Sequence, residues 1–347
     1  MTILTSVCVA IWTWLSLSSL GVGQSLPTVD LGYQVQRASS FNSTGQFYNF
    51  SNIRYAQPPI GELRWAPPVS PTGRNTTTND GTSFGPICPQ AIPGWIIIAE
   101  EFVASYVLGT TDEFNYTSAL EAANKFNATY SPSSGTSEDC LFLDIFVPKS
   151  IFDSSAKRKR SGGAPVLVWV YGGGYTEGSK VANGSPAGII KASQANETEG
   201  VIVVAMNYRL GAFGWLSGPT FSTNGTQNLG LYDQRLALEW VQEHIGKFGG
   251  DPNRVTVIGE SAGGGSIFHQ ITAFAGQKPV PFQQAVLQSA AWLPTPSGFQ
   301  QELVYQEFLG RLNVSTLEEA RQLPSEVLQE ANYAQIAAAS YGTFVCK

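Results

Sequence analysis

The sequence of 347 residues is 43% hydrophobic and 13% charged, and its formal net charge is −6. A chain of this length can bury a large core, either as one big α/β domain or as two smaller ones. The negative charge, with an isoelectric point near 5.1, disfavours nucleic acid and anionic membrane surfaces as partners.

The first 23 residues are apolar, carry no charged side chain and end in the small residues Gly21-Val-Gly23. This pattern predicts a secretory signal peptide over residues 1–23, with an uncleaved membrane anchor as the alternative. No later stretch is apolar for long enough to span a bilayer. We therefore expect a secreted, extracellular protein whose mature part begins near residue 24.

Cysteines and glycosylation sequons agree with secretion. Of the four cysteines, Cys8 lies in the signal peptide, Cys88 and Cys140 remain as a plausible pair, and Cys346 has no evident partner. Nine Asn-x-Ser/Thr sequons predict a glycoprotein. They stand at Asn42, Asn49, Asn75, Asn115, Asn127, Asn183, Asn196, Asn224 and Asn313.

Strand and turn residues dominate from Tyr33 to Val69, and two helical segments follow, Ile96–Val107 and Thr117–Phe126. We expect these helices to form a flap over the sheet edge. Residues 138–147 then indicate a strand. The basic run Lys157–Arg160 is interpreted as a solvated loop, with a protease cleavage point as the alternative.

Further buried strands are predicted at Val166–Val170, Val201–Met206 and Ala285–Leu287, and the spacing of apolar residues predicts a helix over Leu231–Phe248. Strands that alternate with helices give a mixed, mostly parallel sheet covered by helices on both faces. After residue 298 three helices and a strand-like end are expected. These are Phe299–Leu312, Thr316–Leu323, Ser325–Ala339 and the end Tyr341–Lys347.

The most informative stretch lies between the last two predicted strands. The β-branched run Val255–Ile258 leads into Gly259-Glu-Ser-Ala-Gly263, and small residues followed by Ile267–Ile271 start a helix. A strand, a sharp turn and a helix with Ser261 at the apex are typical of the nucleophile elbow of α/β-hydrolases. Glycines beside the serine let the strand and the helix pack closely around it.

Competing interpretations of the glycine-rich motifs fail on context. Ser83 also lies in a Gly-x-Ser-x-Gly pattern, but loop residues surround it, so we predict no catalytic role for Ser83. A phosphate-binding loop needs lysine where Gly265 precedes Ser266. A dinucleotide fingerprint starting at Gly172 would need glycine at the position of Glu177.

Several motifs together resemble the type-B carboxylesterase/lipase family, which includes the cholinesterases and many secreted fungal esterases. Residues 259–264 resemble the nucleophile signature of the family, and residues 138–141 its second signature. The resemblance extends from about residue 30 to residue 345. Three further matching motifs are Asn207–Gly214, Asn228–Gln234 and Phe248–Pro252.

The resemblance implies an α/β-hydrolase fold, of which residues 24–347 form the N-terminal part. It implies hydrolysis of small-molecule or lipid esters through an acyl-enzyme, with Ser261 as nucleophile and without cofactor or metal. The N–H groups of Gly173, Gly174 and Ala262 would form the oxyanion hole.

The same resemblance implies two structural features. One is a disulfide between Cys88 and Cys140. The other is a set of two buried ion pairs without a catalytic role, namely Arg64 with Glu138 and Arg209 with Asp233.

The general base is harder to place, because a serine attacks an ester only if a base accepts its proton. His269 lies eight residues after Ser261, about 12 Å along a continuous helix. His244 precedes the strand that leads to Ser261, which separates the two by about 15 Å. We predict that both histidines are structural.

The family takes its acid and its histidine from far downstream of the serine. We therefore expect both to lie beyond Lys347, and we expect this chain to be truncated. Two alternatives to a hydrolase stay open, a non-catalytic cholinesterase-like binding or adhesion module and an inactive fragment. The sequence does not indicate which ester is the substrate or what the oligomeric state is.

Overall fold

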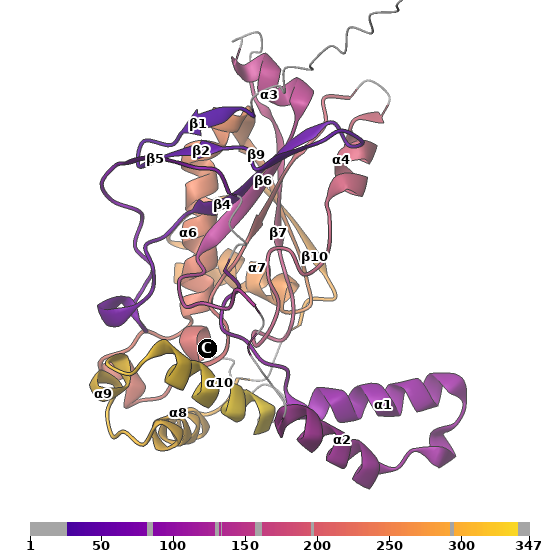
Figure 1. Cartoon of the computed structure of the whole chain (residues 1–347), viewed down its shortest axis with the longest axis vertical. Coiled ribbons are helices and arrows are strands. Elements are labelled where there is room, and N and C mark those ends of the chain that lie inside the picture. The colour runs from indigo at the N-terminus through magenta and orange to yellow at the C-terminus, as the bar shows by residue number, and fades with distance from the viewer. Residues whose placement is uncertain are drawn as a thin grey trace, which may run out of the picture.

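A seven-stranded mixed sheet forms the centre of the computed structural model, which describes residues 26–81, 86–128, 132, 134–156, 162–195, 198–291 and 295–338 (Figure 1). The strand order is β10-β9-β7-β8-β6-β4-β3, and β1-β2-β5 form a separate small sheet whose β2 contacts β4. The strands are β1 Thr28–Asp30, β2 Gln34–Arg37, β3 Ser40–Asn42, β4 Phe47–Arg54, β5 Asn75–Asn79, β6 Phe142–Pro148, β7 Ala164–Val170, β8 Ile202–Met206, β9 Gly250–Glu260 and β10 Gln284–Gln288.

The sheet is mixed, as the sequence predicts. Strands β10, β9, β7 and β8 run parallel, whereas β6, β4 and β3 pair antiparallel. Within this sheet, parallel pairing is therefore confined to the four strands β10, β9, β7 and β8, and β9 leads directly to Ser261. Strand β8 is buried at every position because elements cover both of its faces, which explains its uninterrupted apolar run.

Helices pack on both faces of the sheet. Helices α6 and α7 cover one face, where Leu238 and Val241 of α6 join the main core. On the other face Ile190 of α4 packs against Phe47 and Val203. The helices are α1 Gly94–Leu108, α2 Tyr116–Ala128, α3 Lys149–Ala156, α4 Ala187–Ser193, α5 Gly211–Trp215, α6 Leu229–His244, α7 Ala262–Thr272, α8 Gly298–Leu312, α9 Leu317–Arg321 and α10 Ser325–Ala338.

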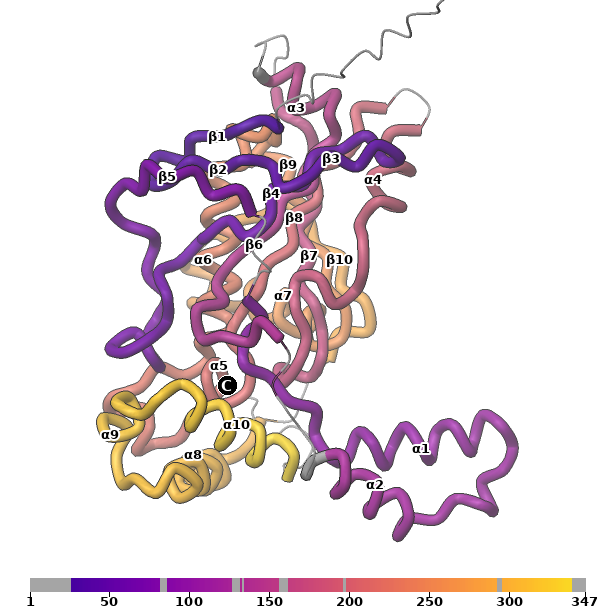
Figure 2. The backbone as a smooth tube through the Cα atoms, viewed as in Figure 1, coloured from indigo at the N-terminus to yellow at the C-terminus, as the bar shows by residue number. Residues whose placement is uncertain are grey.

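The expectation that the two helices after residue 95 form a flap over the sheet edge is wrong. Helices α1 and α2 pack mainly against each other, and the hairpin extends away from the sheet (Figures 1 and 2). Helix α1 is apolar on nearly all sides, so no single stripe directs it onto the core. Tyr106, Val107 and Leu108 are each at least 70% exposed.

Helices α8, α9 and α10 follow the sheet in the chain and gather beside α5, at one end of the sheet (Figure 2). Capping boxes start α8, at Ser297 with Gln300, and α9, at Thr316 with Glu319. These side chains bond the free N–H groups of the first turn and so fix where each helix begins. The predicted signal peptide, Ser83, the basic run 157–160 and the strand-like end 341–347 lie outside the described residues. Within the described part, no helix is both long and apolar enough to cross a bilayer.

Candidate active site

Ser261 occupies a strained turn between β9 and α7, as the elbow pattern predicts. Its backbone angles are φ 53° and ψ −121°, a conformation that side-chain-bearing residues rarely adopt. Three main-chain hydrogen bonds hold the turn. The Ser261 N–H donates to Gln288 O at 3.0 Å, and its carbonyl accepts from Gly265 N at 3.0 Å and Ala291 N at 2.9 Å.

Glycine is required beside the serine because the backbones approach closely. A Cβ on Gly263 would lie 2.1 Å from the carbonyl oxygen of Val170 at the end of β7. A Cβ on Gly172 would lie 2.9 Å from the Cβ of Ser261, so the loop after β7 lies directly against the serine. The elbow pattern predicted this role for the glycines that flank Ser261, Gly263 among them, and the packing supplies its physical reason. It did not predict the close approach of Gly172.

The loop after β7 carries the two glycines expected to bind an oxyanion. Gly173 and Gly174 have φ of 95° and 60°, and the carbonyl of Gly173 accepts from the N–H groups of Thr176 and Glu177. Within the described residues, no protein acceptor takes a hydrogen bond from the N–H of Gly173, Gly174 or Ala262. The loop that carries Gly173 and Gly174 lies against Ser261 through Gly172, and Ala262 follows Ser261 directly in the chain.

Glu177 is a member of this loop that the sequence did not single out. Burial raises the pKa of its carboxyl group, and the nearby Glu100 of α1 raises the pKa further. A carboxyl three residues after Gly174 was the available signal, but the effect of Glu100 on it depends on where α1 lies. Its position places a titratable group beside the candidate oxyanion loop.

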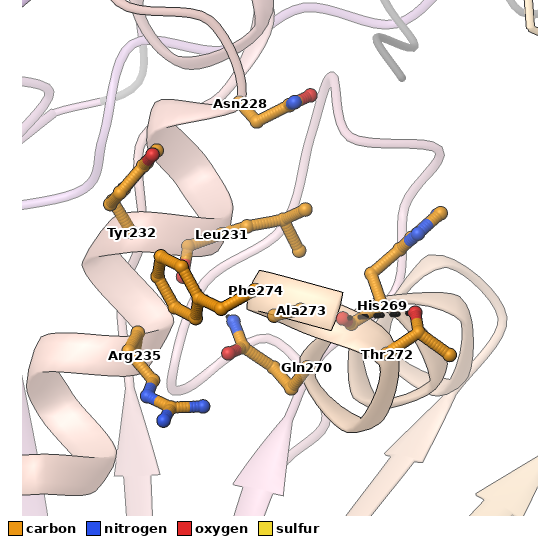
Figure 3. Close-up of a pocket in the computed structure, with 9 residues that line it drawn as sticks. All are labelled: Asn228, Leu231, Tyr232, Arg235, His269, Gln270, Thr272, Ala273 and Phe274. Atoms are coloured by element: carbon orange, nitrogen blue, oxygen red, sulfur yellow. Dashed lines mark hydrogen bonds between the residues drawn. The ribbon is translucent and has the colours of Figure 1, made fainter. Parts of the chain in front are cut away.

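The two histidines lie away from the serine. Helix α7 is continuous from Ala262 to Thr272, so His269 is about 12 Å along it from Ser261. His269 lines a cavity of about 320 Å³ together with Tyr232, Arg235 and Phe274 (Figure 3). Burial lowers the pKa of His269.

His244 lies at the end of α6 and is 7% exposed. Its ring packs against Tyr33 and Trp240, with centroid separations of 5.9 and 4.9 Å. Burial lowers the pKa of His244, an effect that the neighbouring Glu243 partly offsets. Both histidines therefore favour the neutral form, and each has a packing environment remote from the elbow.

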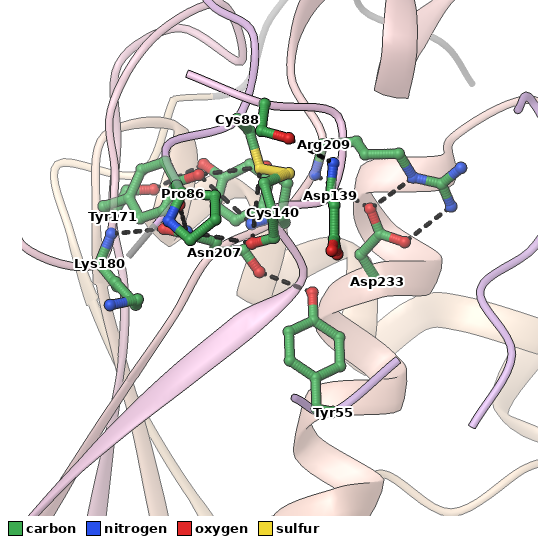
Figure 4. The surroundings of a disulfide bond; sticks show 12 residues. Tyr55, Pro86, Cys88, Asp139, Cys140, Tyr171, Lys180, Asn207, Arg209 and Asp233 are labelled. Atoms are coloured by element: carbon green, nitrogen blue, oxygen red, sulfur yellow. Dashed lines mark hydrogen bonds and ion pairs between the residues drawn. A yellow bond between two sulfur atoms is a disulfide. The ribbon is translucent and has the colours of Figure 1, made fainter. Parts of the chain in front are cut away.

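The ion pairs and the disulfide lie where the resemblance puts them. Cys88 and Cys140 are joined by a disulfide (Figure 4). Both side chains of each expected ion pair are at most 9% exposed, and the charged atoms approach to 2.7 Å. The pairs are Arg64 with Glu138 and Arg209 with Asp233.

A third buried ion pair was missed by the sequence analysis. Lys180 Nζ lies 2.8 and 2.9 Å from the two carboxylate oxygens of Asp144, and both side chains are at most 5% exposed. The available signal was Asp144 itself, because a carboxylate in the middle of a buried strand requires a partner. In the described residues, no group of three or more His, Cys, Asp or Glu side chains could hold a metal ion.

Comparison with known proteins matches residues 34–342 to a family model described as the carboxylesterase family. The chain is 48% identical over 327 residues to carboxylesterase patB of Aspergillus clavatus, covering 92% of this chain and 58% of that protein. It is 35% identical over 259 residues to lipase 2 of Geotrichum candidum, covering 72% of this chain and 42% of that lipase. The chain thus spans well under two thirds of the length of these relatives.

Among solved structures, EstA of Aspergillus niger superposes with a TM-score of 0.70 at 29% sequence identity. The match covers 89% of this chain and 51% of EstA. The mixed sheet with helices on both faces is therefore the α/β-hydrolase fold of these esterases.

Proposed function

Because the chain belongs to the carboxylesterase family, we propose that it hydrolyses carboxylic esters with Ser261 as the nucleophile. One observation supports this proposal above the others. A serine held in a strained strand-to-helix turn lies against a glycine loop, and three main-chain N–H groups around it have no protein acceptor among the described residues.

The chemistry follows from these groups. The Ser261 hydroxyl attacks the ester carbonyl carbon and gives its proton to a base, and the carbonyl oxygen becomes an oxyanion. The N–H groups of Gly173, Gly174 and Ala262 would stabilise that charge, at about 3 kcal/mol for each well-placed donor. The alcohol leaves with a proton, and water then hydrolyses the acyl-enzyme.

We assign neither histidine of the chain as the general base. His269 is about 12 Å from Ser261 along one helix, and His244 packs between Tyr33 and Trp240.

The substrate we propose is a small-molecule or lipid ester, since relatives named as a carboxylesterase and as a lipase both align with the chain. We propose further that the protein is secreted and glycosylated. The Cys88–Cys140 disulfide suits an oxidising compartment. Five sequon asparagines of the described residues are exposed, namely Asn75, Asn115, Asn183, Asn224 and Asn313.

Turnover of p-nitrophenyl esters by the protein purified from its own source tests the proposal. We expect clear turnover, abolished by Ser261→Ala and retained in Ser83→Ala. Activity that survives Ser261→Ala would overturn the proposal.

A further inference from the structure

The candidate oxyanion loop is anchored at its far end by other parts of the chain. Gly178 N–H donates to Gln90 Oε1 at 2.8 Å, and Ala91 N–H donates to the carbonyl of Thr176 at 3.0 Å. Lys180 N–H donates to Asn207 Oδ1 at 2.9 Å. The loop is therefore tied, two to six residues after Gly174, to the segment after Cys88 and to the end of β8.

Asn207, which makes the last of these contacts, also bonds two other segments of the chain (Figure 4). Its side chain is 1% exposed, and its Nδ2 group donates to Pro86 O at 2.9 Å and to Cys140 O at 3.1 Å. One amide thus joins the loop, through Lys180, to both chain segments that the disulfide links. Both N–H groups and the oxygen of this amide are used, which fixes its orientation.

The Lys180–Asp144 ion pair is the second anchor. Asp144 lies on β6, and its Oδ1 atom also accepts from Asn52 N–H at 2.8 Å, where β4 is bulged. Burying two charges brings little net stability, because desolvation offsets their attraction. The lysine side chain does, however, connect the end of the loop to the centre of the sheet at one defined point.

We propose that Asn207 and the Lys180–Asp144 pair are positioning residues that fix the two glycine N–H groups beside Ser261. This inference rests on the proposed function. Gly173 and Gly174 have no side chains to pack, and glycine loses more conformational freedom on ordering than any other residue. A useful oxyanion donor must be placed within about 0.5 Å, so the order of this loop has to come from its neighbours.

Paired variants separate positioning from stability. Lys180→Met with Asp144→Asn removes both charges, keeps the side-chain sizes and leaves an oxygen that can accept from Asn52. Lys180→Met alone leaves a buried carboxylate without its cation and should destabilise the chain more than the pair does. Asn207→Ala removes the other anchor, the side-chain amide that bonds Lys180, Pro86 and Cys140.

A matched control exists on α3. Lys149 and Asp153 form an ion pair of the same two residue types, and both side chains are partly exposed. Lys149→Met with Asp153→Asn changes the charge in the same way at a site remote from the loop.

Hydrogen exchange read by mass spectrometry tests the positioning without requiring activity. In the paired 144/180 variant, we expect the bonded amides of Thr176, Glu177, Gly178 and Lys180 to exchange about tenfold faster, while amides of β8 and the control variant keep their rates. Unchanged exchange at these amides in both the paired variant and Asn207→Ala would overturn the proposal. Equal acceleration in all strands would also overturn it, because that result indicates global destabilisation.

A kinetic arm distinguishes this proposal from the proposed function. In the protein purified from its own source, the paired variant should lower kcat about tenfold and leave KM unchanged, since oxyanion contacts form only in the transition state. An unchanged kcat despite faster loop exchange would overturn the positioning role. If the unmodified protein hydrolyses no ester, the proposed function fails, and the exchange measurement still decides whether these residues order the loop.

Discussion

The buried cation Arg64 gives the sharpest prediction about stability, because its guanidinium joins three distant segments. Its Nε and Nη2 atoms donate to Glu138 at 2.8 and 2.7 Å, and its Nη1 donates to the carbonyls of Arg321 and Leu323 at 2.6 and 2.7 Å. The side chains of Arg64 and Glu138 are 9% and 3% exposed. The change Arg64→Met keeps the aliphatic stem and removes all four hydrogen bonds.

The magnitude follows from what is left behind. A buried carboxylate without its cation costs about 3–5 kcal/mol. Each of the two carbonyls that lose a donor adds about 1 kcal/mol, less where water replaces the arginine. We expect Arg64→Met to lower the free energy of unfolding by about 5 kcal/mol, and Arg64→Met with Glu138→Gln to recover more than half of that loss.

Urea denaturation followed by tryptophan fluorescence measures the change. Arg74 is the matched control, because its ion pair with Asp30 is exposed, with side chains 57% and 52% accessible. Arg74→Met should cost less than about 1 kcal/mol. If Arg64→Met proves no more damaging than Arg74→Met, the inference that the Arg64–Glu138 pair is a structural element is refuted.

Three more predictions concern the elbow, the loop and the disulfide. Gly263→Ala places a methyl group 2.1 Å from a carbonyl of β7, so we expect a loss of soluble protein or a large drop in Tm; an unchanged Tm would contradict this packing. Burial raises the pKa of Glu177 in the folded protein above its value in the unfolded chain. The folded protein therefore loses stability as the pH rises from the unfolded-state pKa through the raised one, because the buried carboxyl must then ionise. Glu177→Gln should therefore raise Tm at pH 7 and not at pH 4, and the opposite pH trend would contradict the sign. Replacing Cys88 and Cys140 by alanine opens a loop of 52 residues and should lower the free energy of unfolding in urea by about 4 kcal/mol. A change near zero would contradict a stabilising role for the disulfide.

Much of the fold could be predicted because its signals are local. The apolar runs of β7 and β8, the helical spacing of α6 and the elbow around Ser261 each depend on a few consecutive residues. The distance from Ser261 to His269 was also predictable, since it depends only on helix geometry.

Features that depend on the order of the strands could not be predicted. Lys180 and Asp144 are 36 residues apart. They meet because the loop of Lys180 is bonded to Asn207 at the end of β8, and β8 pairs with β6, a neighbour that local patterns do not reveal. The direction of the α1–α2 hairpin was missed for a related reason, because α1 has no single apolar stripe that selects a packing partner. The effect of Glu100 on the pKa of Glu177 depends in turn on the placement of α1.

The identity of the nucleophile is tested most directly by a fluorophosphonate probe on the protein purified from its own source, with the adduct mapped by mass spectrometry. We predict a single adduct on the Ser261 hydroxyl, lost in Ser261→Ala and unchanged in Ser83→Ala. An adduct on any other serine, or ester hydrolysis that continues while Ser261 stays unlabelled, would contradict the assignment.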